Sequence, residues 1–192
     1  MMLTERAKEL IPKARIFSLE TVKNIYPERV ISIFQEADDE GKYLSDSDME
    51  EIANLVPFLR ESLENSKTIR DKAQEIVEGA RKEVLKAFPE ITGPGGELYP
   101  PNRAEACWRD LWHFLRCISY AIAGKIEQFT SDFGLANMEL LYQELKVPLP
   151  AMVLGLEKVK TYSLYYFSEE QKSFLSPYFD HLIERLKQFK SG

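Results

Sequence analysis

The chain has 192 residues, of which 44% are hydrophobic and 29% are charged, and its formal net charge is −6. This length allows one domain with a sizeable core, or one domain with a terminal arm. The acidic balance argues against a nucleic-acid groove and against binding to an anionic membrane surface. The aromatic content of 11% is too high for a disordered chain.

The cysteine content and the chain start indicate a reducing compartment. Cys107 and Cys117 fall on one predicted helix and point to different faces, so a disulfide between them is not expected. The N-terminal residues are charged and lack a continuous apolar stretch, and no segment is apolar and long enough to span a bilayer. We therefore expect no signal peptide, no integral membrane segment and a cytoplasmic location.

Residues 1–40 are expected to form an N-terminal arm of two short helices, interrupted near Pro12 and Pro27. The second of these helices carries an apolar stripe over residues 30–34. The charged run 38–40 is expected to be a solvated turn. The arm therefore precedes the main domain, which we expect to begin at residue 41.

Long helical patterns continue along the chain between a few breaking points. A capping-box pattern from Ser47 to Glu50 predicts the next helix start, and Pro57 should kink that helix. A longer amphipathic helix is expected to end before Pro89. The glycine- and proline-rich segment 92–96 is the strongest breaker in the chain.

The second half of the chain continues the helical pattern. Residues 103–124 are apolar on most sides and predict a central, buried helix. Further helices are expected around 136–146, from 148 through 159, and from a capping box at Ser168. Because we find no convincing strand and no heptads, the sequence predicts an all-α, globin-like fold for residues 41–192.

A stripe on the predicted central helix combines a thiol, an acid and a base. Arg103, Cys107, Asp110 and Phe114 recur at i, i+4, i+7 and i+11. From the residues alone two plain interpretations stay open, because a cysteine on an apolar helix is commonly a core residue and an Asp–Arg pair commonly joins helices. Arg109 lies well off this stripe.

Three other motifs carry little weight. The segment 93–96 lacks the Gly-Lys-Ser/Thr ending of a phosphate loop. His113 and His181 have no metal-ligand spacing with acids or thiols, so no metal site is expected. A nucleophile pair of Cys107 with His113 is disfavoured because the helix turns the two side chains apart, and we expect no catalytic residues.

A set of ordered motifs resembles one protein family. Residues 88–116 contain Phe-Pro, a Gly-Gly turn, a tyrosine, an arginine and Cys-x-Arg-Asp, and residues 115–121 read Leu-Arg-x-x-Ser-Tyr-Ala. Residues 43–45 (Tyr-Leu-Ser) and 177–183 add matches towards both ends. In this order and spacing the motifs resemble the phycobiliproteins, the open-chain tetrapyrrole antenna proteins of cyanobacteria and red algae. The allophycocyanin branch is the most similar, over roughly residues 20–190.

The resemblance implies a pigment site. Cys107 would attach one linear tetrapyrrole (bilin), with phycocyanobilin expected, and Asp110 would accept hydrogen bonds from its inner nitrogens. Arg109 and Arg103 would hold the propionates. The side chains expected along the pigment are those of His113, Phe114 and Tyr142.

Several positions depart from the family pattern. Glu97, Pro100-Pro101 and His113 replace the usual residues, and the N-terminal arm is longer than in standard antenna subunits. Since His113 is ionisable, it predicts pH-sensitive absorption. Cys117 aligns with a buried aliphatic position, so a second bilin is not expected. These differences indicate a divergent, minor member.

The resemblance implies a non-enzymatic light-harvesting protein that passes excitation energy on, in or near the phycobilisome at the cytosolic face of thylakoid membranes. Residues 1–40 would pair the chain with itself or with another phycobiliprotein subunit, as in that family. A bilin lyase is a further implied partner, and no nucleic acid is expected. The alternative is a pigment-poor or pigment-free scaffold, adaptor or regulator of antenna assembly with the same fold.

Overall fold

Helices make up the regular structure of residues 3–190, the part of the chain that this computed structural model describes. Within those residues the only strand-like pairing is an isolated bridge between Phe17 and Thr130, so the predicted all-α fold is confirmed. Two short 3₁₀ helices, η1 (Ile11–Lys13) and η2 (Pro57–Leu59), accompany the α-helices. The α-helices are α1 (Glu5–Leu10), α2 (Glu28–Asp39), α3 (Asp46–Leu55), α4 (Arg60–Ala87), α5 (Pro101–Ala123), α6 (Asp132–Leu145), α7 (Leu149–Leu164) and α8 (Glu169–Lys187).

Local capping chemistry sets two of the helix starts. Ser168 and Gln171 form the expected capping box of α8. At α3 the predicted cap was wrong by two positions: the Ser45 hydroxyl accepts from the Asp48 N–H at 3.1 Å, and the Asp48 carboxylate accepts from the Ser45 N–H at 2.8 Å. Asp48 supplies the reciprocal acceptor three residues after Ser45, so Ser47 already lies inside the helix.

Pro57 divides the helical stretch that the sequence predicts around it. α3 ends at Leu55, and Val56 leaves the helical region with a ψ of 77°, as is usual before a proline. The short turn η2 then leads into α4. The expected kink is therefore a complete break, because proline has no N–H to donate to the preceding turn.

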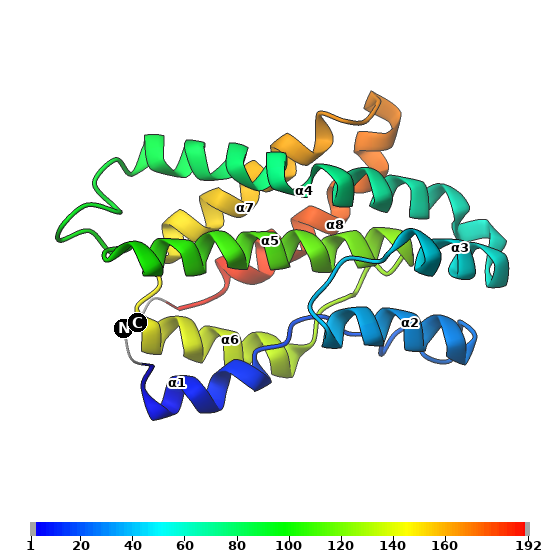
Figure 1. The fold of residues 1–192 in the computed structure, drawn as a ribbon, viewed down its shortest axis with the longest axis horizontal. Coiled ribbons are helices and arrows are strands. Elements are labelled where there is room, and N and C mark those ends of the chain that lie inside the picture. The colour runs from blue at the N-terminus through cyan, green and yellow to red at the C-terminus, as the bar shows by residue number, and fades with distance from the viewer. Residues whose placement is uncertain (1–2, 191–192) are drawn as a thin grey trace.

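α5 is the central helix of the fold (Figure 1). It packs along α4 and also contacts α7 and α8. Every residue from 114 to 123 is at most 7% exposed, which confirms the predicted buried helix. No helix within residues 3–190 is both long and apolar enough to cross a bilayer.

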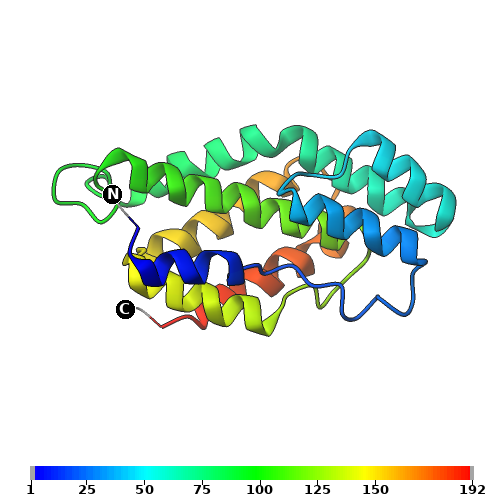
Figure 2. The same cartoon turned by 60° about the horizontal axis from the view of Figure 1, so that its bottom comes forward.

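α1, α2 and α6 lie on the same side of α5 (Figure 1), and α1 lies beside α6 in both views (Figures 1 and 2). Three apolar side chains of the stripe 30–34 are at most 1% exposed, because the core of the chain itself covers them. The ring of Phe34, for example, meets that of Tyr120 edge-on at 6.2 Å. Association of residues 1–40 with another subunit stays a prediction, and residues 1–2 lie outside the described part.

Residues 14–18, which we call the strap, run from η1 along the start of α6. A Cβ atom at Gly134 would lie 1.7 Å from the carbonyl oxygen of Arg15, so only glycine allows this close approach. Two backbone hydrogen bonds of 2.7 Å also hold the strap, from the Ser18 N–H to the Phe129 carbonyl and from the Ser131 N–H to the Ile16 carbonyl. The strap is therefore a firmly anchored segment.

Candidate functional site

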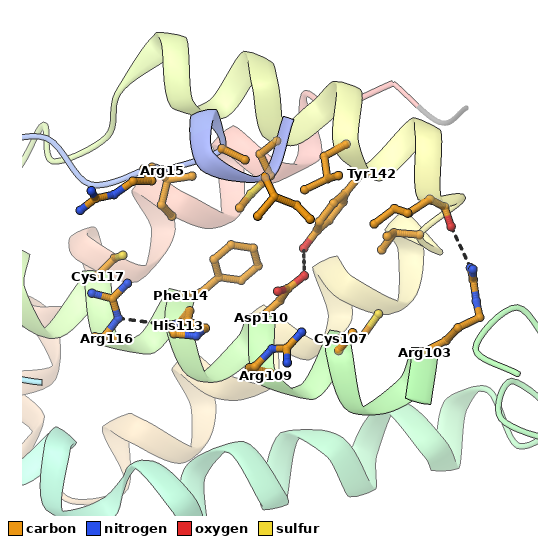
Figure 3. Close-up of a pocket in the computed structure, with 18 of the residues that line it drawn as sticks. Arg15, Arg103, Cys107, Arg109, Asp110, His113, Phe114, Arg116, Cys117 and Tyr142 are labelled. Carbon is orange, nitrogen blue, oxygen red and sulfur yellow. Dashed lines mark hydrogen bonds between the residues drawn. The ribbon is translucent and has the colours of Figure 1, made fainter. Parts of the chain in front are cut away.

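A cavity of about 470 Å³ lies between α5, α6 and the N-terminal segment. Figure 3 shows α5 along one side of it, with α6 and the first residues of the chain on the other. The structure brings the predicted site residues together in its wall: Arg103, Cys107, Arg109, Asp110, His113, Phe114 and Tyr142. The stripe seen in the sequence therefore faces a concave surface with room for a ligand.

The regular geometry of α5 keeps the stripe together. Pro101 suits the first helical position, since the N–H that it lacks has no partner within the helix there. Arg109 lies off the stripe by helical geometry, but its long, exposed side chain reaches the cavity beside Asp110 (Figure 3). α5 thus supplies a thiol, a carboxylate and a guanidinium to one wall.

The thiol of Cys107 is 4% exposed. Burial raises its pKa to about 12; the charge of Asp110 also raises the pKa, and that of Arg103 lowers it. The thiol is therefore protonated at neutral pH, whereas the nucleophile in cysteine chemistry is the thiolate. Covalent attachment through the Cys107 sulfur therefore needs the proton to be removed.

Asp110 carries the carboxylate in the middle of the cavity wall. The Tyr142 hydroxyl of α6 donates a hydrogen bond of 3.2 Å to it (Figure 3). Burial raises the pKa of Asp110 to about 6, against the lowering effects of the Tyr142 bond and the Arg109 charge. The group is thus largely ionised at pH 7, and its oxygens have further capacity to accept N–H donors from a ligand.

Arg103 ties two helices together at one end of the cavity. Its guanidinium donates to the carbonyl oxygens of Leu145 and Lys146 at 2.9 and 3.1 Å, at the end of α6, and to that of Glu97 at 3.0 Å. These bonds hold the end of α6 against the start of α5. The sequence did not suggest this positioning role, which is distinct from the propionate contact expected for Arg103.

His113 is held in its neutral form. The Arg116 Nε–H donates to His113 Nδ1 at 3.2 Å, so the ring proton lies on Nε2. Burial lowers the pKa of His113 to about 4, with further lowering by the Arg116 and Arg109 charges and a raising effect from Asp38. A pH response through this residue would therefore fall near pH 4 and not near neutrality.

Asp38 of α2 also lines the cavity, between Arg15 and Arg116. Figure 3 shows these two arginines at the end of the cavity opposite Arg103. The Asp38 carboxylate accepts from Arg116 at 2.9 Å and from Arg15 at 2.5 Å. The expected solvated turn at 38–40 is wrong for Asp38, which is 8% exposed. No local pattern predicts this cluster, because Asp38 and Arg116 lie 78 residues apart in the sequence.

The second thiol also reaches the cavity. Cys117 is 2% exposed and lines the same space as Cys107, although the helix turns the two side chains to different faces. The two residues are free cysteines, and burial raises the pKa of Cys117 to about 12. The cavity continues along and partly around α5, which helical projection alone does not reveal.

Comparison with known proteins gives a consistent result. The family model described as "Phycobilisome protein" matches residues 32–186. The chain is similar to the allophycocyanin subunit alpha-B of Nostoc sp. strain PCC 7120, with 30% identity over 161 residues, covering 82% of this chain and 98% of the relative. It is also 29% identical over 154 residues to the allophycocyanin alpha-B chain of Porphyra purpurea, covering 80% of this chain and 96% of that one.

The allophycocyanin alpha-B chain of Cyanidium caldarium shares 30% identity over 154 residues, which covers 80% of this chain and 94% of the relative. The family match includes all of α5 and α6, and therefore the predicted site residues. Identity near 30% over almost the whole length of these relatives marks the chain as a divergent, allophycocyanin-like member. The chain thus belongs to the phycobilisome protein family.

Proposed function

We propose that this chain binds one linear tetrapyrrole covalently at Cys107 and serves as a light-harvesting subunit. The observation that carries the proposal is the shared cavity: Cys107 and Asp110 line one space, on a helix inside the family match. The relatives are named as subunits or chains of allophycocyanin, which supports the same general role.

The residues in the wall suit such a ligand. A cavity of about 470 Å³ lies within the usual range of small-molecule sites, roughly 300–1,000 Å³. The carboxylate of Asp110 is held by a neutral hydroxyl, so it can accept hydrogen bonds from pyrrole N–H groups. Phe114 and Tyr142 supply buried aromatic walls. The donor set and the apolar lining therefore fit a conjugated, positively charged ring system with acidic side chains.

Each residue takes a distinct part in this proposal. The Cys107 thiol would add across the exocyclic double bond of a terminal ring, its sulfur going to one carbon and a proton to the other, and Asp110 would accept hydrogen bonds from the protonated inner nitrogens. Arg109 is exposed at the cavity edge and is the stronger candidate for a propionate, because the Arg103 guanidinium already donates to backbone carbonyls. His113 lies along the same wall in its neutral form. A bilin bound in this way supplies absorption of visible light and transfer of excitation energy.

The family also guides the proposed setting of the protein. We place the chain at the cytosolic face of thylakoid membranes, in or near the phycobilisome, without enzymatic activity. Its partners would be a second copy or other phycobiliprotein subunits, contacted through residues 1–40, and a lyase that delivers phycocyanobilin. The family membership and the allophycocyanin relatives support these assignments.

A second candidate is a pigment-free adaptor of antenna assembly with the same fold. The burial of Cys107, which is 4% exposed, favours this candidate, because covalent attachment needs a reactive thiolate. The two candidates differ in one measurable property, the covalent pigment.

Co-expression with a phycocyanobilin-producing pathway separates the two candidates. After denaturing electrophoresis, zinc-enhanced fluorescence should appear on the band of the wild-type chain and of Cys117→Ala, and it should be absent from Cys107→Ala. Fluorescence that survives Cys107→Ala would refute attachment at Cys107. A wild-type band without pigment, from a folded chain co-expressed with a lyase, would favour the adaptor.

A further inference from the structure

Residues 3–13, which include α1 and η1, form part of the cavity wall, and we call them the lid. Leu3 and Ile11 line the cavity, whereas Ala7 and Leu10 are buried against the rest of the chain. Figure 3 shows the blue ribbon of the lid close to the cavity side chains, between Arg15 and Tyr142. The lid therefore covers the space into which a ligand of α5 would have to enter.

The polar contacts of the lid with α6 lie at its exposed surface, beside the apolar packing of Ala7 and Leu10. The Thr4 hydroxyl donates to the Glu144 carboxylate at 2.7 Å, and the Arg6 guanidinium lies 3.9 Å from the same carboxylate. Thr4 and Arg6 are exposed, and ion pairs between solvated groups contribute little to stability. Leu3 and Ile11 remain 39% and 44% exposed, so the lid closes the cavity incompletely.

The strap that follows is held much more firmly. The strap has the two backbone hydrogen bonds of 2.7 Å described above. In addition, Arg15 of the strap forms ion pairs with Asp38 at 2.5 Å and with Asp39 at 2.6 Å. A weakly held segment next to an anchored one opens locally without global unfolding. The boundary between the weakly held lid and the anchored strap lies at Ala14, the residue that follows η1.

The lid also lies outside the segment that matches the family model. The family model begins to match at residue 32, and the alignments with the three relatives cover 80–82% of this chain. The residues of α5 and α6 in the cavity wall are within the family match, whereas Leu3 and Ile11 precede it. The lid residues of the cavity wall thus lie outside the family match, and those of α5 and α6 lie inside it.

We propose that the lid is an intramolecular gate, which opens at Ala14 to admit a linear tetrapyrrole to Cys107 and closes beside the bound molecule. The identity of the ligand rests on the proposed function, whereas the gating of Cys107 does not. Opening would make the thiol accessible to solvent and to a base. Closure would then shield the site from water.

Alkylation of the full-length chain by iodoacetamide tests the gate without any pigment. Peptide mass mapping gives the rate of alkylation at Cys107 in the wild type and in two variants. Glu144→Ala removes the contacts that Thr4 and Arg6 make with α6. Leu10→Ser weakens the apolar packing of the lid. We expect about a five- to tenfold faster reaction in each variant, since the population of the open form sets the reactivity of a buried group. Glu9→Ala, an exposed position on the same helix, should react like the wild type.

A repeat in low concentrations of urea separates local from global opening. Local opening exposes little surface, so the rate at Cys107 should change little with urea, whereas global unfolding would show the full denaturant dependence. Unchanged rates in Glu144→Ala and Leu10→Ser would overturn the gate, as would a rise that follows global stability.

The same variants with added phycocyanobilin distinguish the two proposals. Faster alkylation together with faster pigment attachment supports both. Faster alkylation without pigment attachment in any chain, with or without a lyase, leaves the gate in place and refutes the proposed ligand. If the wild type and the variants attach pigment at the same rate and are alkylated at the same rate, the gate is refuted and the proposed function is retained.

Discussion

Two aspartates line the same cavity, and their surroundings differ in kind. Asp38 is buried between Arg116 and Arg15, with N–O distances of 2.9 and 2.5 Å. Asp110 is bonded to a neutral hydroxyl, that of Tyr142, and burial raises its pKa to about 6. The Asp38 carboxylate is thus paired with two positive charges of the chain. The charged form of Asp110 is instead destabilised by burial.

This difference separates a structural group from a site group. Asp38 joins α2, the strap and α5, so its charge serves the fold. Asp110 costs stability in the ligand-free chain, because its charged form is disfavoured by burial. A cationic ligand with N–H donors would relieve that cost, which is the arrangement expected of a preorganised binding site.

Removal of the Asp38 carboxylate should have the largest effect on stability. Asp38→Ala leaves Arg116, which is 7% exposed, without its ion-pair partner, and we expect a loss of about 3–5 kcal/mol. Urea unfolding at pH 7 measures this loss. Asp39→Ala, at the exposed partner of Arg15, should cost less than about 1 kcal/mol and serves as the control. Equal losses in the two variants would contradict a structural role specific to Asp38.

Removal of the Asp110 charge should have the opposite effect on stability, a gain at neutral pH. Its pKa in the folded chain, about 6, lies above the value of an unfolded aspartate, so the folded state binds the proton more tightly and stability falls as pH rises from about 4 to 6. Asp110→Asn should therefore stabilise the pigment-free chain at pH 7 by about 1–3 kcal/mol, and this gain should vanish near pH 4. Unfolding curves at both pH values check this, with the exposed Asp71→Asn as control. Loss of stability in Asp110→Asn at pH 7 would contradict the assignment of Asp110 as a site group that differs from Asp38.

Tyr142→Phe tests how far the hydroxyl of Tyr142 stabilises the charged form of Asp110. Without the hydroxyl donor, which lowers the pKa of Asp110, that pKa should rise further above about 6. Carbon NMR of the carboxyl group during a pH titration reports the change directly. Tyr120→Phe removes a hydroxyl that donates to the Lys42 carbonyl, near Asp38, and should leave the titration of Asp110 unaltered.

The smallest expected effect concerns His113, which lies on α5 between Asp110 and Arg116, the ion-pair partner of Asp38. Its pKa, lowered to about 4, lies below that of an unfolded histidine, so the contribution of neutral His113 is present above pH 6.5 and is lost as pH falls towards 4. His113→Gln should cost about 1 kcal/mol at pH 7 through the bond from Arg116. Proton NMR should show the His113 ring neutral at pH 5.5; a titration centred near 6.5 would contradict this.

Sequence reasoning identified the helices and the α5 wall because both depend on local spacing. Residues at i, i+4, i+7 and i+11 share a helix face wherever the helix lies, and the order of motifs from residue 43 to 183 indicated the family. The same reasoning failed where the partner is distant: the expected solvated turn at 38–40 contains Asp38, whose partner Arg116 is on another helix. It also separated Cys117 from a cavity that both thiols line.

The sequence by itself determined that this protein is an all-α member of its family, with a thiol and a carboxylate on one stripe of a buried helix. Helix formation and amphipathic spacing are encoded within a few residues, which is why these features could be read in advance. Only the tertiary structure decided which charges are neutralised and what covers the cavity. Those outcomes depend on burial and on contacts between segments such as the lid and α6, which meet because the whole chain packs and not because of any local pattern.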